Sequence, residues 1–244
     1  MVSAAVSPPG KPQATCRLRL TKKGPARFMS HLDFIRAVER AVRRAALPVA
    51  LTEGFHPHPR MSFSPALPVG VESECELVDV ELRERVGADE VKERLEPLLP
   101  DGLRLMWCMV LPFGEPPLSS VIRAASYEMV FECGDGIASQ DAVEAAIEGF
   151  VRADSVRVIR TTPKGTKEVN IRPLVYALDV DQRDGAAHVR MLAAAGPAGH
   201  VRPDDVAREI ARRAGLGRAC ARARIVRKDF YVERNGELVP FPRE

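Results

Sequence analysis

The stretch SHLDFIRAVERAVRRAAL (residues 30–47) decides how the first half of this chain is interpreted. Apolar residues recur along it at helical spacing, so we expect an amphipathic helix with one face in a core. Ser30 is placed as the N-cap, and Asp33 approximates the acidic partner of a capping box. Pro48 ends the helix, because proline lacks the amide hydrogen that a further turn requires.

Outward from this helix, the sequence indicates four strands and one more helix. The expected strands are CRLRLTK (16–22), residues 61–63, ELVDVELR (76–83) and LRLMWCMVL (103–111), and the expected helix is ADEVKERLEPLL (88–99). The main signal for the strands is period-two alternation. The resulting order is β-α-β-β-α-β, which is the ferredoxin-like arrangement.

After the proline-rich PFGEPPLSS (112–120), the same order returns with one strand more. The expected strands span 126–133, 155–162, 174–181, 187–194 and 221–232, and the expected helices span 139–152 and 204–215, the latter starting at Pro203. We therefore predict an α+β protein of two tandem ferredoxin-like domains with antiparallel sheets. Their expected bounds are 15–111 and 123–234, with a flexible leader at 1–14, a linker at 112–122 and a C-terminal tail at 235–244.

The composition excludes several classes of protein. With 45% hydrophobic and 28% charged residues, the chain is globular rather than disordered. No apolar run approaches the roughly 20 residues that span a bilayer, and the N-terminus lacks the features of a signal peptide, so we expect a soluble cytoplasmic protein without membrane contact. The five cysteines are scattered and never spaced as CxxC, so we expect no metal and no cofactor.

Charge is unevenly distributed along the chain, although its net value is only +3. Residues 15–75 hold ten basic against five acidic side chains, and residues 202–228 hold nine against three; residues 72–101 instead hold four against eleven. Separate basic and acidic regions fit an anionic ligand, because clustered charge matters more than the total in selecting partners. Solvated surface charge is the alternative explanation.

The first predicted helix carries a row of arginines on one side: Arg36, Arg40, Arg43 and Arg44. Guanidinium groups stay charged and offer forked donors, so this row suits phosphates. An ordinary solvated face paired with Glu39 and Asp33 is the alternative. His31 opens the same helix, where it could orient a ligand, act as a base, or pack at the helix entry.

The loop GFHPHPRMSFS (54–64) repeats a His-Pro pair. Two histidines at i and i+2 of an extended segment point to opposite sides, so they do not readily share one metal. The prolines instead stiffen a loop that projects His58, Arg60 and Ser62 in a fixed direction. We interpret the loop as a preorganised element beside an anion site, with catalysis by a histidine left open.

A third stretch, RTTPKGTKEVNIRP (160–173), is predicted to be a loop with exposed donors and cations. Lys164, Lys167 and Arg172 are its candidate contacts to a phosphate backbone. A polar loop without a ligand is the alternative. Because aromatic residues make up only 5% of the chain, we expect any RNA to be recognised by shape and phosphate rather than by base stacking.

Residues 27–82, from RFMSHLDFIRAVERAV to LVDVEL, together with KGTKEVNIRP (164–173), resemble the bacterial radical SAM-linked protein family. That family is a domain of unknown function encoded beside, or fused to, a radical SAM protein, so the resemblance implies such a partner and no activity of the chain itself. Its pattern leads us to expect Asp where this chain has Asn170, which weakens an acid–base role there. A looser likeness of fold is to the RAMP endoribonucleases that process CRISPR repeats and often use a histidine base.

Three functions are open at this point. The first is a non-catalytic module that presents an RNA, such as tRNA or rRNA, to the radical SAM partner for modification or processing. One wall of its RNA-binding site would consist of His31, Arg36, Arg40, Arg43, His58 and Arg60. The other wall would consist of Lys164, Lys167 and Arg172. The second is a metal-independent endoribonuclease with His31 or His58 as base. The third is a protein-interaction subunit that docks through the acidic residues 72–101 without binding nucleic acid.

Overall fold

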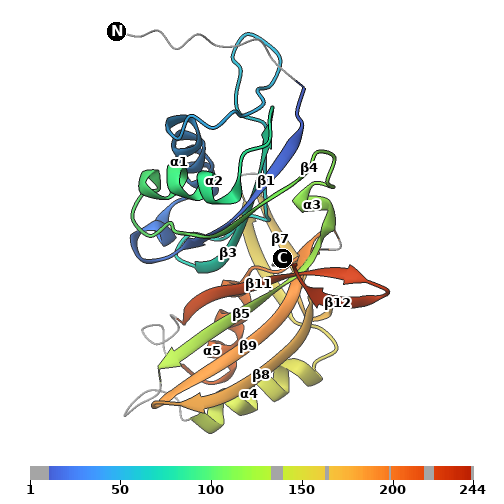
Figure 1. Ribbon diagram of the computed structural model, residues 1–244. Coiled ribbons are helices and arrows are strands. Elements are labelled where there is room, and N and C mark those ends of the chain that lie inside the picture. Colours follow the sequence, from blue (N-terminus) through green and yellow to red (C-terminus); the bar gives the residue numbers. More distant parts are fainter. Residues whose placement is uncertain (1–10, 133–139, 163–164, 198, 217–222, 243–244) are drawn as a thin grey trace. The chain divides into compact units, whose positions relative to one another are not determined.

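A computed structural model describes residues 11–132, 140–162, 165–197, 199–216 and 223–242 (Figure 1). The protein is of the α+β class, as predicted, with antiparallel strand pairs predominating and few helices. The described chain divides into two compact units: unit 1 holds residues 11–69 and 75–120, and unit 2 holds residues 70–74 and 121–242. No helix in the described ranges is long and apolar enough to cross a membrane.

Unit 1 places helices α1 and α2 on one face of a sheet (Figure 1). Its strands lie in the order β4-β1-β3-β2, and the β1–β4 and β2–β3 pairs are antiparallel. Its elements are β1 (Ala14–Lys22), η1 (Gly24–Phe28), α1 (His31–Arg44), β2 (Met61–Phe63), β3 (Glu72–Leu82), α2 (Ala88–Leu95), η2 (Glu96–Leu98), β4 (Leu105–Pro112) and α3 (Leu118–Val121). The first residues of β3 belong to unit 2, and α3 ends at the boundary between the units.

Strand β1 is buried on both faces. Leu18 and Leu20 share one apolar cluster with Phe34 of α1. On the other face, Arg17 is only 7% exposed and donates to both carboxylate oxygens of Asp79 on β3, at 2.7 and 2.8 Å. The alternation in CRLRLTK therefore separates an apolar buried face from a polar buried face, rather than a core face from a solvated one.

Local sequence signals set the ends of α1 as expected. Ser30 Oγ accepts a hydrogen bond from the backbone N–H of Asp33 (3.2 Å) and donates one to its carboxylate (2.7 Å), which forms the predicted capping box. The Ser30 hydroxyl holds the pKa of Asp33 below its ordinary value. The helix ends at Arg44, ahead of Pro48.

The long strands of unit 2 pair antiparallel in the order β8-β9-β5-β11. Its elements are β5 (Ile122–Glu132), α4 (Gln140–Arg152), β6 (Arg157–Thr162), β7 (Gly165–Asn170), η3 (Arg172–Leu174), β8 (Val175–Arg183), β9 (Ala186–Gly196), β10 (Gly199–His200), α5 (Pro203–Arg213), β11 (Arg224–Arg234) and β12 (Glu237–Pro240). Strand β10 pairs with β9, and the first residues of β3 pair in parallel with β11. Strands β6 and β7 form a separate two-stranded ribbon.

Two stretches differ from the prediction. Residues 165–170 are not a loop, because they form β7, which pairs with β6 along its whole length. Strand β6 lies within the strand predicted at 155–162, whereas the polar sequence of β7 lacks a clear apolar alternation, so its strand character depends on the pairing itself. The predicted C-terminal tail contains β12, which pairs with β11 across Asn235 and Gly236. Both residues have positive φ, as a tight two-residue hairpin turn requires.

At the other end of the chain, residues 1–10 of the predicted leader lie outside the described residues, and β1 begins at Ala14.

Candidate functional site

Residues 52–58, here called the HPH loop, are closed at their base by backbone contacts. The N–H of Thr52 donates to the carbonyl of His58 (2.8 Å), and the N–H of His58 donates to the hydroxyl of Thr52 (3.0 Å). Just outside the loop, Leu51 and Pro59 form a β-bridge. Gly54 adopts φ +122°, a conformation that side chains rarely allow. The loop is therefore held in shape at its base, and Gly54 permits the turn at its tip.

Helix α1 holds the HPH loop through one carboxylate. Glu39 Oε1 lies 3.2 Å from His58 Nδ1 and accepts hydrogen bonds from Arg43 Nε and Nη2 at 3.1 and 3.0 Å. Arg43 also donates to the carbonyl of Pro57 (3.2 Å). Burial raises the pKa of Glu39, but its hydrogen bonds with His58 and Arg43 outweigh this and hold the pKa below its ordinary value. Two predicted ligand-binding residues, Arg43 and His58, thus fasten the loop to the helix.

The other flank of α1 carries arginines without such contacts. Among the described residues, neither Arg40 nor Arg44 forms a hydrogen bond or an ion pair. Both line a cavity of about 310 Å³, together with Ala37, Ala41 and residues 97–100. We call this cavity the arginine groove. No acidic side chain is among these lining residues, so the two guanidinium groups are available to an anion.

Arg36 lies one turn before Arg40 on the same helix. Its guanidinium is 3.8 Å from the Asp33 carboxylate, and the arginine side chain is 67% exposed. A contact of this length on an open surface contributes little to stability. Arg36 therefore continues the row of accessible cations toward the helix N-terminus.

His31, the first residue of α1, packs beside an aromatic pair. Its ring lies edge-on to Phe63, with centroids 6.2 Å apart, and Phe63 lies edge-on to Phe34 at 6.0 Å. His31 and His58 thus have different neighbours. Within the described ranges, no group of three or more His, Cys, Asp or Glu side chains is placed to hold a metal ion.

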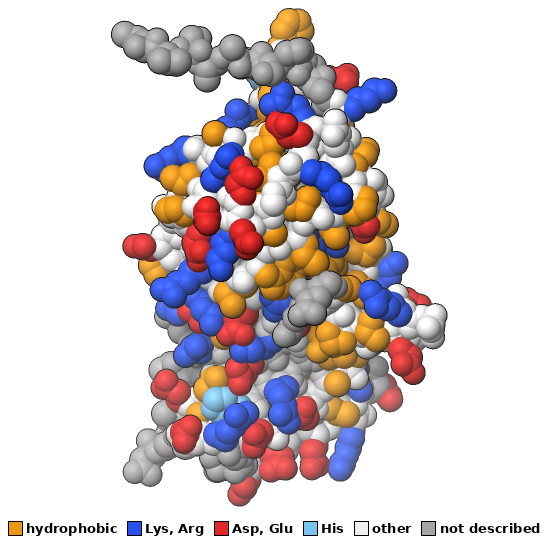
Figure 2. Space-filling view, viewed as in Figure 1, with side chains coloured by type: hydrophobic (Ala, Val, Ile, Leu, Met, Phe, Trp, Pro, Cys, Tyr) orange, Lys and Arg blue, Asp and Glu red, His pale blue; other side chains and the backbone are white. Residues whose placement is uncertain are grey.

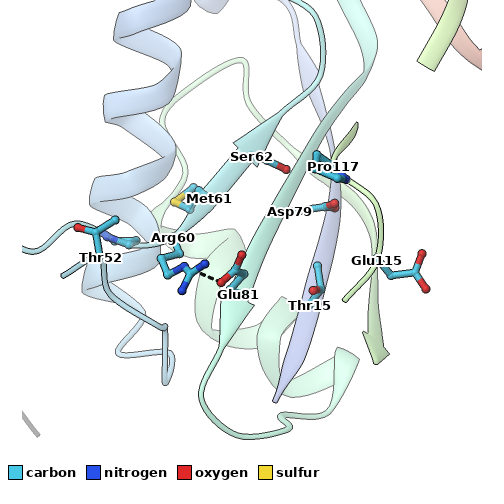
Figure 3. Close-up of a pocket in the computed structure, with 10 residues that line it drawn as sticks. Thr15, Thr52, Arg60, Met61, Ser62, Asp79, Glu81, Glu115 and Pro117 are labelled. Carbon is cyan, nitrogen blue, oxygen red and sulfur yellow. Dashed lines mark ion pairs between the residues drawn. The ribbon is translucent and has the colours of Figure 1, made fainter. Parts of the chain in front are cut away.

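Arg60 and Ser62 line a second cavity of about 310 Å³ in unit 1, shown in Figure 3. Arg60 Nε lies 2.8 Å from Glu81 Oε2. Asp79, whose carboxylate is bound in the buried ion pair described above, and Glu115 also line this cavity. Carboxylates outnumber cations along the lining, which disfavours an anion there. This environment does not suit the predicted phosphate contacts of Arg60 and Ser62.

In unit 2, Arg172 and Asn170 hold backbone groups together. Arg172 donates to the carbonyl of Val151 at 2.8 and 3.1 Å and to that of Val175 at 3.0 Å, so it ties the end of α4 to the start of β8. Asn170 Oδ1 accepts hydrogen bonds from the N–H groups of Val156 (3.0 Å) and Arg172 (3.2 Å). These contacts close the base of the β6–β7 ribbon. They give both residues a structural role.

The remaining predicted cations of this stretch lie on the ribbon. Lys167 is exposed on β7, directly opposite Arg160 of β6. Arg160 Nε donates to the buried Asp205 of α5 at 2.7 Å, which anchors the ribbon to the helix. Lys164 lies outside the described residues. Of the three cations predicted here, Lys167 is thus the one that the structure describes as exposed and available.

Comparison with known families places these residues in context. The family model described as "Uncharacterized protein conserved in bacteria (DUF2344)" matches residues 15–203. The chain belongs to this family. The matched range of this DUF2344 chain contains every predicted site residue, from His31 to Arg172. No curated protein matches the chain.

Solved structures show only distant similarity to the DUF2344 chain. A chain of a Cbf5-Nop10-Gar1 complex is 12% identical, with a TM-score of 0.47; the match covers 88% of this chain and 48% of that chain. DyPB from Rhodococcus jostii RHA1 is 14% identical, with a TM-score of 0.21, covering 96% and 97% of the two chains. Similarities at this level carry no argument about function.

On the face shown in Figure 2, the described basic and acidic side chains are interspersed over the region of α1 and α2. The arginine groove differs from this mixed surface, because no acidic side chain is among its lining residues.

Two features of the site were not predicted from the sequence. Residues 97–100 form a wall of the arginine groove, although they are distant in sequence from α1. Phe55, at the tip of the HPH loop, is 99% exposed. A phenylalanine set between a glycine and a His-Pro-His sequence is a signal that could have identified an exposed aromatic residue.

Proposed function

We propose that this chain is a non-catalytic module that binds RNA and presents it to a radical SAM partner, in tRNA or rRNA modification or processing. The observation that carries the RNA-binding part is the pair of exposed arginines, Arg40 and Arg44, beside a groove without acidic lining. The resemblance of residues 27–82 and 164–173 to radical SAM-linked proteins supports the partner.

The contacts of each arginine support this choice of binding surface. A guanidinium already bound to a carboxylate or carbonyl has few donors left for a ligand, as with Arg43. Arg40 and Arg44 are four residues apart, so they project from the same side of α1 in successive turns. Such a pair can contact two phosphates of one strand, and each contact releases a counterion from the RNA.

We propose further that each unit is ferredoxin-like. The orders β4-β1-β3-β2 in unit 1 and β11-β5-β9-β8 in unit 2 both support this, because each places the first and third strands of a β-α-β-β-α-β motif at the centre. In unit 2, the β6–β7 ribbon would then be an insertion between the first helix and the second strand of the motif.

A metal-independent endoribonuclease is the second candidate, favoured by the contact between His58 and Glu39. A carboxylate 3.2 Å from Nδ1 can orient an imidazole so that Nε2 faces a substrate, and the His58 side chain is 63% exposed. Labelled RNA incubated with the protein in chelator would then acquire cyclic phosphate ends that His58→Ala abolishes. RNA left intact by the parent protein would reject this candidate.

The acidic-docking alternative is less well supported. Three of the acidic residues between 72 and 101 are buried, namely Glu72, Glu76 and Asp79. Their charges are therefore not part of an accessible acidic face that a basic partner could contact.

The test of the RNA proposal is the salt dependence of RNA binding in a charge-matched pair of variants. Arg40→Ala/Arg44→Ala should flatten the slope of log K against log salt by about 1.4, since each phosphate contact to single-stranded RNA contributes about 0.7. Arg85→Ala/Arg94→Ala removes the same charge from exposed positions outside the groove and should leave the slope nearly unchanged. Equal effects in the two variants would refute the groove as the phosphate site.

A further inference from the structure

Phe55 is the most exposed large apolar side chain of the described residues, at 99%; Ile159 follows at 71%. A single exposed apolar residue is ordinary on a protein surface and carries little meaning by itself. What distinguishes Phe55 is the support beneath it. The HPH loop is closed by two hydrogen bonds between Thr52 and His58 and is fastened to α1 through Glu39 and Arg43.

This support holds the base of the HPH loop and leaves the Phe55 ring uncovered at its tip. Pro57 and Pro59 restrict the backbone after the tip. Gly54, just before Phe55, has φ +122°, and a Cβ built there would meet no atom within 4 Å. The glycine is thus required for backbone conformation and not for space. A loop closed at its base in this way loses less backbone freedom than an open loop when its tip binds a partner.

The surroundings of Phe55 indicate the kind of partner. An aromatic anchor of a protein interface normally lies within a ring of other apolar contacts that exclude water. In the HPH loop, the residues next to Phe55 are instead exposed and mostly polar, namely Glu53, Gly54 and His56. A nucleic-acid base needs only one open ring face with cations nearby, because stacking is tolerant of sequence and the phosphates are held by charge.

The charges near the loop also fit a polyanion. The helix that holds the loop carries Arg36, Arg40 and Arg44 on its exposed surface. The HPH loop itself contains one carboxylate, Glu53. Exposed cations together with an exposed aromatic ring are the combination used by surfaces that bind single strands.

We infer that Phe55 is a stacking residue for an unpaired base, so that the ligand of this module is single-stranded or looped-out RNA. This inference rests on the proposed function, and it replaces the expectation that RNA would be recognised without stacking. The arginine groove would hold the phosphates, and the HPH loop would present Phe55 to a base of the same strand. Double-stranded RNA, whose bases are stacked on each other, would gain nothing from Phe55.

The experiment compares two probes of equal length and charge, a ten-nucleotide oligoadenylate and an abasic oligonucleotide. Phe55→Ala should bind oligoadenylate about 5- to 100-fold more weakly than the parent and should bind the abasic probe equally well. Phe55→Trp should show fluorescence quenching with oligoadenylate and not with the abasic probe, measured against the parent, whose one tryptophan is Trp107. Ile159→Ala, a matched loss of an exposed apolar side chain, should leave binding of both probes unchanged.

The outcomes separate this inference from the proposal on which it rests. If Phe55→Ala binds both probes like the parent while Arg40→Ala/Arg44→Ala weakens both, stacking is refuted and RNA binding through the groove stands. If the parent binds neither probe at low salt, both proposals fail. If Phe55→Ala instead abolishes the capture of a protein partner and leaves oligoadenylate binding intact, Phe55 is a protein anchor and the inference is wrong.

Discussion

The buried ion pair between Arg17 and Asp79 yields a prediction about the stability of unit 1. Asp79→Ala would leave the Arg17 guanidinium without its carboxylate in a site where both side chains are under 10% exposed. It removes two charge-assisted hydrogen bonds of 2.7 and 2.8 Å, each worth about 1.5–3 kcal/mol. We therefore expect a loss of about 3–5 kcal/mol, the range measured when one partner of a buried pair is removed.

The assay is urea unfolding followed by tryptophan fluorescence. Trp107 is the one tryptophan of the chain, and it lies on β4 opposite Arg19 of β1, so its emission reports on the sheet that contains the pair. At a slope of about 2 kcal/mol per molar urea, the midpoint should fall by about 2 M. Glu115→Ala, which removes an exposed carboxylate from the same cavity, should shift it little.

A second variant separates the missing charge from the missing volume. In Arg17→Met/Asp79→Leu, apolar side chains of similar size replace both charges, and the free energy of unfolding should recover most of its parental value. A loss below about 1 kcal/mol in Asp79→Ala would refute the reasoning, because the guanidinium would then be solvated or otherwise compensated without its partner.

Three further predictions concern the ribbon, a histidine and the thiols. Asn170→Ala should speed hydrogen exchange of the backbone amides in the β6–β7 ribbon and lower the free energy of unfolding by about 1–2 kcal/mol. In Asn170→Asp, which keeps both accepted hydrogen bonds, these amides should exchange at the parental rate. Burial, and then nearby arginines, lower the pKa of His200. The contribution of His200 to the free energy of unfolding should therefore be fully present above about pH 6.5 and should decline as the pH falls toward the lower folded-state pKa. His200→Gln should remove this pH dependence from the free energy of unfolding measured between about pH 6.5 and 5. Contact with Cys16 lowers the pKa of the half-buried Cys108, while contact with Cys108 and burial raise the pKa of Cys16. Iodoacetamide should therefore label Cys108 before Cys16 in peptide mass spectra, and faster labelling of Cys16 would contradict this.

Elements with strong local signals could be predicted from the sequence. The capping box at Ser30 and the proline at the start of α5 each act over a few residues, and each lies where it was predicted. The turn between β8 and β9 falls between the strands predicted at 174–181 and 187–194. In that turn, Asp184 and Gly185 both have positive φ, as a two-residue hairpin requires. Strand β6 lies within the strand predicted at 155–162, but β7 has no such signal, because GTKEVN has no apolar face of its own.

The sequence pattern could not predict which charged side chains are buried. Alternation in CRLRLTK shows that residues such as Arg17 share a face, but not whether that face is covered. The same is true of Asp79 in the acidic residues 72–101, which read as a surface patch although Asp79 is 6% exposed. Sequence periodicity fixes the direction of a side chain, while its environment depends on strands and loops that are distant in the chain.

The four arginines of α1 show the same limit at the candidate site. Helical spacing places Arg40, Arg43 and Arg44 on one broad side of the helix, and from the sequence alone each is an equally good candidate to bind phosphate. The HPH loop docks on only one flank, where Arg43 is bound to Glu39 and to a backbone carbonyl. A guanidinium whose donors are already hydrogen-bonded forms few additional hydrogen bonds with a phosphate. Docking of the loop therefore gives Arg43 a structural role and leaves the guanidinium groups of Arg40 and Arg44 accessible to a ligand.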